Sequence, residues 1–464
     1  MNNKSAIIGG ILLLLAALAA LAPYFAGIKA EASLRADHEI MASEMVVPGL
    51  TITLDSYQRG YLASEAVTAI TYTSGAENAQ PLRFELLHHI NHFPSPSHGA
   101  IASATSELVL PPELQQVAEP FLAGRPPLTI TTYIGLTGVE TVTLSSPAFK
   151  AAIQQDGSSL EWQGVTGNGT RNGDANHITG DLTLPGLRYN HPEGTLAFSD
   201  LHYSTAINRG AHELWFGTTK ASLKSLQLGG TGESPAFTLN DVHIASDQLE
   251  RGAVTDTSVT IELGKSGVGE VAVESAIFDM ELRNLDTQTV AEIQRAVQDA
   301  SSSGDESQLG VALFDAIPAL LKAQPEFNIR NLHFKSTLGN FDGKLHLAFN
   351  GEWNDAMMDN PLEILAMLKA DLDIAMSKSL LVSLGQSQMR ATVIAMAEIQ
   401  GEELSDEEIE AMARERAAQQ LELLAANEYL LDKDELYTSK IHFEQGQLTI
   451  NGKPANEFFG EAAE

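Results

Sequence analysis

The chain has 464 residues, of which 44% are hydrophobic and 19% are charged, and this composition excludes wholesale disorder. Its 60 acidic residues outnumber its 28 lysines and arginines, and the resulting net charge of −32 repels phosphate backbones, so nucleic acid is not an expected partner. Cysteine is absent, which excludes disulfides, thiolate metal sites and thiol nucleophiles.

An uncharged apolar run at the N-terminus predicts a transmembrane helix. Residues 6–28 carry no charge, and at about 1.5 Å per residue such a helix crosses a hydrocarbon core of about 30 Å. Lys4 precedes the run, so we expect residues 1–5 in the cytoplasm and the rest in the periplasm, after a linker at residues 29–48. A cleavable signal peptide is the alternative, but its apolar region is typically about 7–15 residues long, and the greater length favours a retained single-pass anchor in the inner membrane.

Alternating apolar and polar residues predict a β-rich periplasmic domain over residues 49–464. Leu50, Ile52 and Leu54 alternate with polar residues, and similar runs recur between glycines, asparagines and prolines. Such alternation directs one face of a sheet to an apolar core and the other to water, as in antiparallel sheets. The expected fold is α+β and mostly β: an N-terminal transmembrane helix followed by an elongated, curved antiparallel sheet with helical inserts.

Helical periodicity and capping signals place the two inserts at about residues 286–322 and 381–430. Asp286 can cap the first helix, and Ser405 with Glu408 forms a capping box before an apolar stripe in the second insert.

A short pattern, apolar–Asx–apolar–His–apolar, occurs around Asp200, Asp241 and Asn331. Because Asx residues compete for backbone hydrogen bonds and tolerate bends, it predicts strand breaks or the start of a strand after a turn. The spacings of 41 and 90 residues do not fit a solenoid, and chance recurrence is the alternative.

No motif in the chain indicates catalysis. His88, His89, His92 and His98 form the densest histidine cluster, but they lack the His-Glu-x-x-His pattern of zinc enzymes, and their spacing does not make them converge. The glycine-rich stretch 164–169 lacks the lysine of a phosphate-binding loop. We therefore expect no catalytic residue, no metal and no cofactor, and we expect that the protein is not an enzyme.

Methionines concentrate between residues 357 and 412. Flexible thioether side chains suit apolar surfaces that adapt to varied shapes, so this region is a candidate apolar groove, with core filling between helices and sheet as the alternative. The candidate groove residues are Met367, Met376, Met389, Met396 and Met412.

A motif after the apolar run is similar to that of the YdgA-like family of bacterial envelope proteins. It comprises Tyr57, Arg59, Gly60, Tyr61 and Ser64. Arg59-Gly60 is typical of a tight turn in which glycine adopts a positive φ, so we interpret the motif as structural.

Three later segments resemble the same family in order along the chain: Phe314–Lys322, Leu368–Ile374 and a closing hairpin at Gln445–Lys453. The chain departs from the family pattern at His89–Pro94, where members often have His-Gly-Pro. The resemblance implies an inner-membrane-anchored periplasmic protein with a long β body and no established activity. More distantly, this organisation resembles AsmA-type proteins implicated in envelope lipid traffic.

These features suggest that an apolar sheet face binds or conveys lipid or another amphiphile. The alternative is an envelope scaffold or assembly factor that holds protein partners at sheet edges or through the acidic region Glu402–Glu435. The expected partners are the inner membrane and either lipid or envelope proteins. The oligomeric state is left open.

Overall fold

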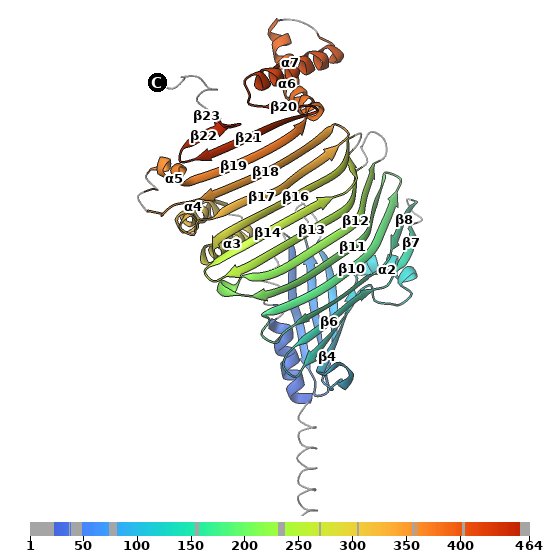
Figure 1. The fold of residues 1–464 in the computed structure, drawn as a ribbon. Coiled ribbons are helices and arrows are strands. Elements are labelled where there is room, and N and C mark those ends of the chain that lie inside the picture. The colour runs from blue at the N-terminus through green and yellow to red at the C-terminus, as the bar shows by residue number, and fades with distance from the viewer. Residues whose placement is uncertain are drawn as a thin grey trace, which may run out of the picture. The chain divides into compact units, whose positions relative to one another are not determined.

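The computed structural model describes residues 23–36, 38, 49–73, 81–153, 157–230, 237–268, 271–303, 306–354, 357, 360–400 and 404–454. The chain divides into two compact units, the first formed by Met1–Gly210 with Val297–Glu306 and the second by Ala211–Ala296 with Ser307–Glu464. Figure 1 shows that strands dominate the fold, and every described ladder is antiparallel, as the sequence predicts.

Most of the predicted membrane anchor, residues 6–22, lies outside the described residues, as do residues 1–5 and 39–48. Residues 23–36 are helical, so the helix runs on through positions 29–36, which we assigned to a linker. Within the described ranges, no helix has the length and apolar character needed to cross a membrane.

The first unit contains strands paired in the order β1–β2–β3–β4–β5–β6–β9–β10–β11, with β8 pairing the far half of β10 and β7 pairing β8. Its elements are β1 (Leu50–Arg59), β2 (Ala63–Tyr72), β3 (Leu82–Asn91), η1 (Pro96–His98), β4 (Ala100–Val109), α2 (Pro112–Leu122), β5 (Thr129–Gly135), β6 (Glu140–Ser146), β7 (Phe149–Ile153), β8 (Ser158–Trp162), β9 (Val165–Arg171), β10 (His177–His191) and β11 (Gly194–Arg209).

The N-terminal helix, residues 23–36, packs on one face of this sheet. Its small residues Ala26 and Ala30 allow close approach, and they form an apolar core with inward-facing residues of β2 to β5. The buried strand residues of this core are Ala66, Ile90, Ala102 and Ile134.

The second unit pairs its strands in the order β12–β13–β14–β16–β17–β18–β19–β21–β22–β23, with β15 beside β13 and β16 and β20 beside β21. Its strands are β12 (Trp215–Gly230), β13 (Phe237–Arg251), β14 (Val254–Leu263), β15 (Ser266–Val268), β16 (Val271–Asp286), β17 (Glu326–Ser336), β18 (Gly339–Phe349), β19 (Leu368–Ser377), β20 (Leu431–Lys433), β21 (Leu436–Glu444), β22 (Gln447–Ile450) and β23 (Lys453–Pro454). Its helical elements are η2 (Ala211–Glu213), the first part of α3 (Thr287–Ser303), α4 from Ser307 on (Glu306–Lys322), α5 (Pro361–Met367), α6 (Lys378–Gln400) and α7 (Asp406–Ala426).

Helices α3, α4 and α7 lie within the two predicted inserts and α6 begins just before the second, whereas α2 and α5 lie outside both. The predicted capping signals of α3 and α7 are confirmed. Asp286 accepts a hydrogen bond from the backbone N–H of Thr289 at 2.9 Å at the start of α3. The side chains of Ser405 and Glu408 form the reciprocal capping box of α7. These local contacts satisfy backbone donors that have no partner within the helix.

The predicted strand breaks at Asx residues are bends inside continuous strands instead. Asp200 and Asp241 both adopt φ 49°, and each lies within a strand that continues on both sides. Asn331 lies where the pairing of β17 with β18 shifts register, between Ile329 and Leu332. A single left-handed or bulged residue redirects a strand without ending its ladder, so β11 and β13 continue past Asp200 and Asp241 to lengths of 16 and 15 residues.

Candidate functional site

The motif residues lie in the β1–β2 hairpin and in its contact with the N-terminal helix. Gly60 does not have the positive φ that we expected. Its N–H donates to the carbonyl of Ala63 at 3.0 Å, and a Cβ at position 60 would lie 2.3 Å from that carbonyl oxygen. Close backbone approach, rather than left-handed geometry, is therefore why the turn uses glycine.

Arg59 and Tyr57 of the motif contact charged residues of the N-terminal helix. Arg59 pairs with Glu31 at 3.4 Å and lies over the Tyr24 ring, 5.9 Å from its centroid. Tyr57 packs against the apolar core beneath the helix, with the guanidinium of Arg35 over its ring, and burial raises the pKa of its hydroxyl. The motif thus fastens the helix to the sheet.

Ser64 reaches the same helix through a buried histidine. The Nδ1 of His92 lies 3.0 Å from the carbonyl oxygen of Tyr61, and because a carbonyl only accepts, Nδ1 carries the proton. The other ring nitrogen, Nε2, then accepts from the Ser64 hydroxyl at 2.9 Å. The fully buried ring lies directly below Gly27 of the helix.

Replacing Gly27 with alanine should weaken this contact. The new Cβ would lie 2.6 Å from Cε1 of His92, a ring that is fully buried, so the helix must shift. We expect a loss of about 1–3 kcal/mol in the free energy of unfolding of the first unit. The control is Gly180→Ala in β10, where the nearest atoms lie 3.7 Å from the new Cβ, and we expect it to change stability by less than about 0.5 kcal/mol.

Urea unfolding can follow the first unit through Trp162, one of the three tryptophans, once Trp215 and Trp353 are replaced by phenylalanine. Equal stability of the two alanine variants would contradict the proposed contact.

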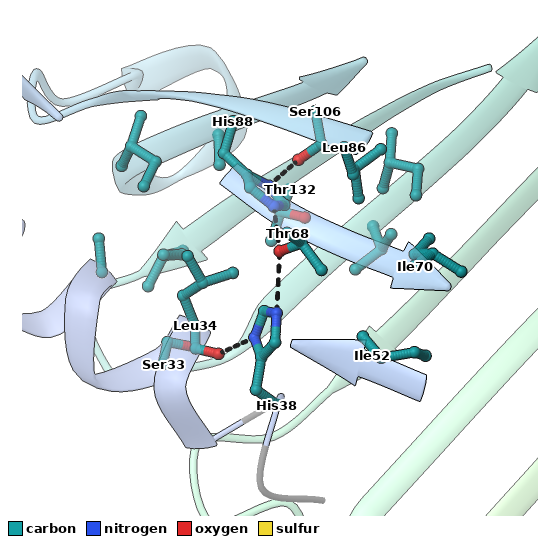
Figure 2. A pocket seen from close by; sticks show the side chains of 16 residues that line it. Ser33, Leu34, His38, Ile52, Thr68, Ile70, Leu86, His88, Ser106 and Thr132 are labelled. Atoms are coloured by element: carbon teal, nitrogen blue, oxygen red, sulfur yellow. Dashed lines mark hydrogen bonds between the residues drawn. The ribbon is translucent and has the colours of Figure 1, made fainter. Parts of the chain in front are cut away.

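A cavity of about 390 Å³ lies between the N-terminal helix and the sheet of the first unit. Figure 2 shows side chains from β1, β2 and β3 directed into it beside those of the helix. Most of its wall is aliphatic. The branched residues of this wall are Leu34, Ile52, Ile70, Leu86, Ile90, Ile130, Ile134 and Val142.

A chain of hydrogen bonds crosses one side of the cavity (Figure 2). The Nδ1 of His38 donates to the carbonyl of Leu34 at 2.8 Å, so Nε2 of the neutral ring accepts from the Thr68 hydroxyl at 2.8 Å. Thr68 Oγ1 then accepts from Nε2 of His88 at 2.7 Å, which leaves Nδ1 of His88 to accept from Ser106 at 2.7 Å. The two imidazoles thus use all four ring nitrogens.

Burial keeps His88 neutral. Its pKa is lowered to about 4, mainly because burial makes the charged form costly and to a smaller extent because a charge on the nearby His38 would repel it. The wall of the cavity is therefore uncharged at this point near neutral pH.

The other clustered histidines do not join this chain. His89 points out from β3 as an exposed side chain, and His98 stacks on Tyr133 with ring centroids 4.0 Å apart. Among the residues that the structure describes, no group of three histidine or carboxylate side chains is placed to hold a metal ion.

The second unit carries a continuous apolar surface on one face of its sheet. Residues paired directly across neighbouring strands share a face, so the register defines rows of side chains. One row consists of Val259, Met280, Ile329, Leu345, Leu372 and Ile441. The next row consists of Leu282, Phe327, Leu347, Ala370, Phe443 and Leu448.

This apolar face is not covered as a core would be. All twelve side chains of the two rows remain partly exposed, and the neighbouring pair Ile244 and Ile261 is 42% and 38% exposed. Aliphatic and aromatic side chains in a packed core are among the most completely buried residues in proteins. The face therefore presents apolar surface to its surroundings.

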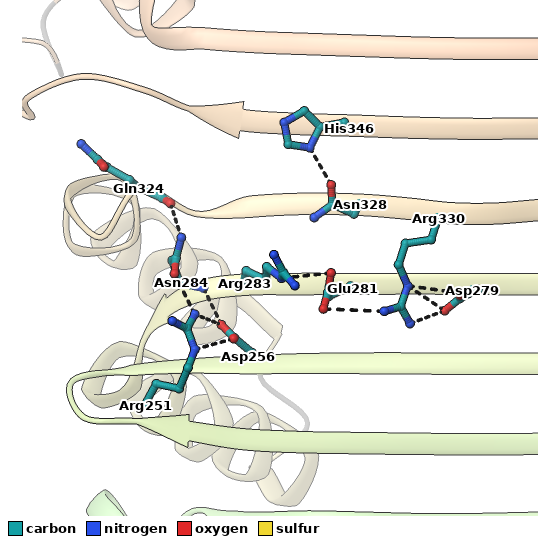
Figure 3. Close-up of polar contacts among 10 residues, drawn as sticks. All are labelled: Arg251, Asp256, Asp279, Glu281, Arg283, Asn284, Gln324, Asn328, Arg330 and His346. Carbon is teal, nitrogen blue, oxygen red and sulfur yellow. Dashed lines mark hydrogen bonds and ion pairs between the residues drawn. The ribbon is translucent and has the colours of Figure 1, made fainter.

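The opposite face of the same strands is polar (Figure 3). Arg251 pairs with Asp256 at 2.6 Å, and Arg330 pairs with Asp279 at 2.6 Å. Along β16, the side chain of Asp279 lies on the polar face and that of the next residue, Met280, lies on the apolar face, because successive side chains of a strand point to opposite faces of the sheet. Helices α3 and α4 lie behind the strands in Figure 3, on the side away from these ion pairs.

The predicted methionine groove is spread over several elements. Met376 belongs to the apolar face, where it is paired with Phe341 and Tyr437. Met367 ends α5 and packs against Gly351. The remaining three lie in the α6–α7 hairpin: Met389 and Met396 on α6, and Met412 on α7.

Comparison with known proteins gives a family but no function. No curated protein and no solved structure matches the chain. The match supports membership of a bacterial family of unknown function, but it does not confirm the name YdgA-like. The chain belongs to the family described as "Bacterial protein of unknown function (DUF945)", which matches residues 2–457.

Proposed function

We propose that the protein, anchored in the inner membrane through residues 6–22 of the apolar run with its bulk in the periplasm, binds the acyl chains of membrane lipids on the apolar face of its second unit. The last residues of the predicted anchor, 23–28, belong instead to the helix that packs on the sheet of the first unit. The observation that carries this proposal is the uninterrupted register of aliphatic and aromatic side chains that remain partly exposed. Burial of this surface against hydrocarbon is favourable at roughly 25 cal/mol per Å².

Acyl chains suit this face better than a protein partner does. A protein interface typically carries about one hydrogen bond per 100–200 Å². The two rows offer no side-chain donor or acceptor, and the strand backbones pair with each other within the sheet. An acyl chain needs no such partner. Neighbouring strands lie about 4.8 Å apart, so the rows form a track across at least six strands, long enough for an extended acyl chain.

Site-specific photocrosslinking in living cells tests the proposal. A benzophenone amino acid at position 261 should capture cellular phospholipid, detected by mass spectrometry of the purified protein. The matched control is position 260, because the adjacent residue on a strand points to the opposite face. Equal lipid capture at the two positions, or none at position 261, would contradict the proposal. Capture of protein alone at position 261 would support the alternative of a scaffold.

A charge on the apolar face should displace the lipid. Ile244 lies directly opposite Ile261, and Ile244→Asp should reduce lipid capture at position 261 at least tenfold, because a carboxylate in contact with acyl chains loses its solvation. Ala245→Asp is the control: its side chain lies on the polar face opposite Lys220, where the new charge has a partner. Equal effects of the two variants would indicate misfolding rather than loss of a lipid surface.

A further inference from the structure

We propose that the cavity of the first unit is a separate binding site for one uncharged apolar molecule, an alkyl chain of about 12–16 carbon atoms or a ring system of similar volume. This inference does not rest on lipid binding by the second unit, because all lining residues belong to the first unit.

The walls come from elements that other contacts already hold in place. Leu34 lies on the helix that Arg59 and Glu31 fasten to the hairpin, and Ile70 and Leu86 lie on the paired strands β2 and β3. A site built on fixed elements keeps its shape when a ligand enters, so little ordering opposes binding. An empty apolar cavity instead forfeits the dispersion contacts that a ligand would make with its walls.

The hydrogen bonds inside the cavity select an uncharged ligand. The imidazoles of His38 and His88 both have partners at each nitrogen, and the Thr68 hydroxyl is used twice. The hydroxyl of Ser33 contacts Glu140. These groups therefore present mainly C–H surface to the cavity. The Glu140 carboxylate already pairs with Arg171, so a ligand's charged group would gain little compensation there.

The volume sets the size of the ligand. A cavity of about 150 Å³ lined by aliphatic side chains stays dry and binds benzene, a molecule of six carbons. The present cavity, at about 390 Å³, is therefore suited to about 12–16 carbon atoms.

Binding of N-phenyl-1-naphthylamine, an uncharged fluorescent probe of sixteen carbons, tests the site directly. The full chain should bind one equivalent with a saturable rise in fluorescence. Dodecanol should displace the probe at least tenfold more effectively than dodecylammonium, which has the same alkyl chain and a charge. Equal displacement by the two would overturn the proposed selectivity, and absence of saturable binding would overturn the site.

Two substitutions locate the probe. Ile70→Trp places a large side chain in the cavity and should abolish the saturable phase, whereas Thr71→Trp, on the opposite face of β2, should retain it. If Ile70→Trp fails to fold, Leu86→Ala provides the second measure. It enlarges the cavity and should shift the most effective alcohol from dodecanol towards longer chains. An unchanged chain-length preference would place the probe elsewhere.

The result can be separated from that of the lipid proposal. Ile244→Asp alters the second unit alone, so it should leave the saturable phase of probe binding unchanged while it reduces lipid crosslinking. Loss of probe binding in Ile244→Asp, with retention in Ile70→Trp, would assign the probe to the sheet face and overturn the cavity site.

Discussion

Replacing Glu140 with alanine is expected to lower the free energy of unfolding of the first unit by about 3 kcal/mol. The Glu140 carboxylate pairs with Arg171 at 2.6 Å and contacts the hydroxyl of Ser33 on the N-terminal helix. The two charged side chains are only 8% and 20% exposed. Removing one member of a shielded ion pair takes a stabilising partner away from a charge that has lost part of its solvation, which typically costs about 3–5 kcal/mol for fully buried pairs and somewhat less here.

Urea unfolding followed by Trp162 fluorescence measures this loss. The matched control is Glu161→Ala, which removes the partner of Lys150 from an exposed pair, 76% and 36% accessible, and should cost no more than about 1 kcal/mol. The double variant Glu140→Leu with Arg171→Met should recover part of the loss, because it removes both shielded charges together. Equal costs for Glu140→Ala and Glu161→Ala would show that shielding of the pair does not matter.

The features predicted correctly from the sequence are those that depend on neighbours in the chain. The turn at Gln445 and Gly446, with φ 53° and 76°, joins β21 to β22 as expected, because only a few residue types adopt left-handed geometry readily. The capping box of α7 depends on Ser405 and Glu408 three residues apart. Such signals need no knowledge of tertiary structure.

The candidate sites depend instead on the register between paired strands and on the packing of the helix against the sheet, neither of which can be predicted from the sequence alone. Thr68 and His88 meet because β2 pairs with β3 in one register, and His38 reaches them from a segment that precedes both strands. The end of the apolar run predicts a linker from residue 29, but Lys29 donates to the carbonyl of Leu136 and the helix docks on the sheet.

The apolar face shows the same limit. Strand alternation predicts that one face is apolar, but it cannot say whether a second layer covers that face. The methionine cluster predicts this surface less well than the strand alternation does. Of the five candidate methionines, Met376 lies on the apolar face of the sheet, whereas Met396, for example, lies on helix α6 in contact with Arg416. Clustering in sequence predicts proximity in space only within one element.

Acidification should destabilise the first unit through His88. The pKa of His88 is about 4 in the folded protein, against about 6.5 for an unperturbed histidine. Below pH 6.5 the unfolded chain therefore takes up a proton that the folded chain does not, so stability falls as the pH decreases from 6.5 to 4 and stops falling below that range. Between pH 7.5 and pH 5 we expect this group to remove about 2 kcal/mol from the free energy of unfolding.

The comparison of two neighbouring histidines isolates this effect from other titrating groups. His88→Gln should be less stable than the original chain at pH 7.5, because it interrupts the bonds to Thr68 and Ser106, but its stability should fall by about 2 kcal/mol less between pH 7.5 and pH 5. His89→Gln, at the exposed adjacent position, should keep the original pH dependence. If both variants keep the original pH dependence, another group causes the acid sensitivity of the first unit. His88 would then accept a proton in the folded protein despite its burial.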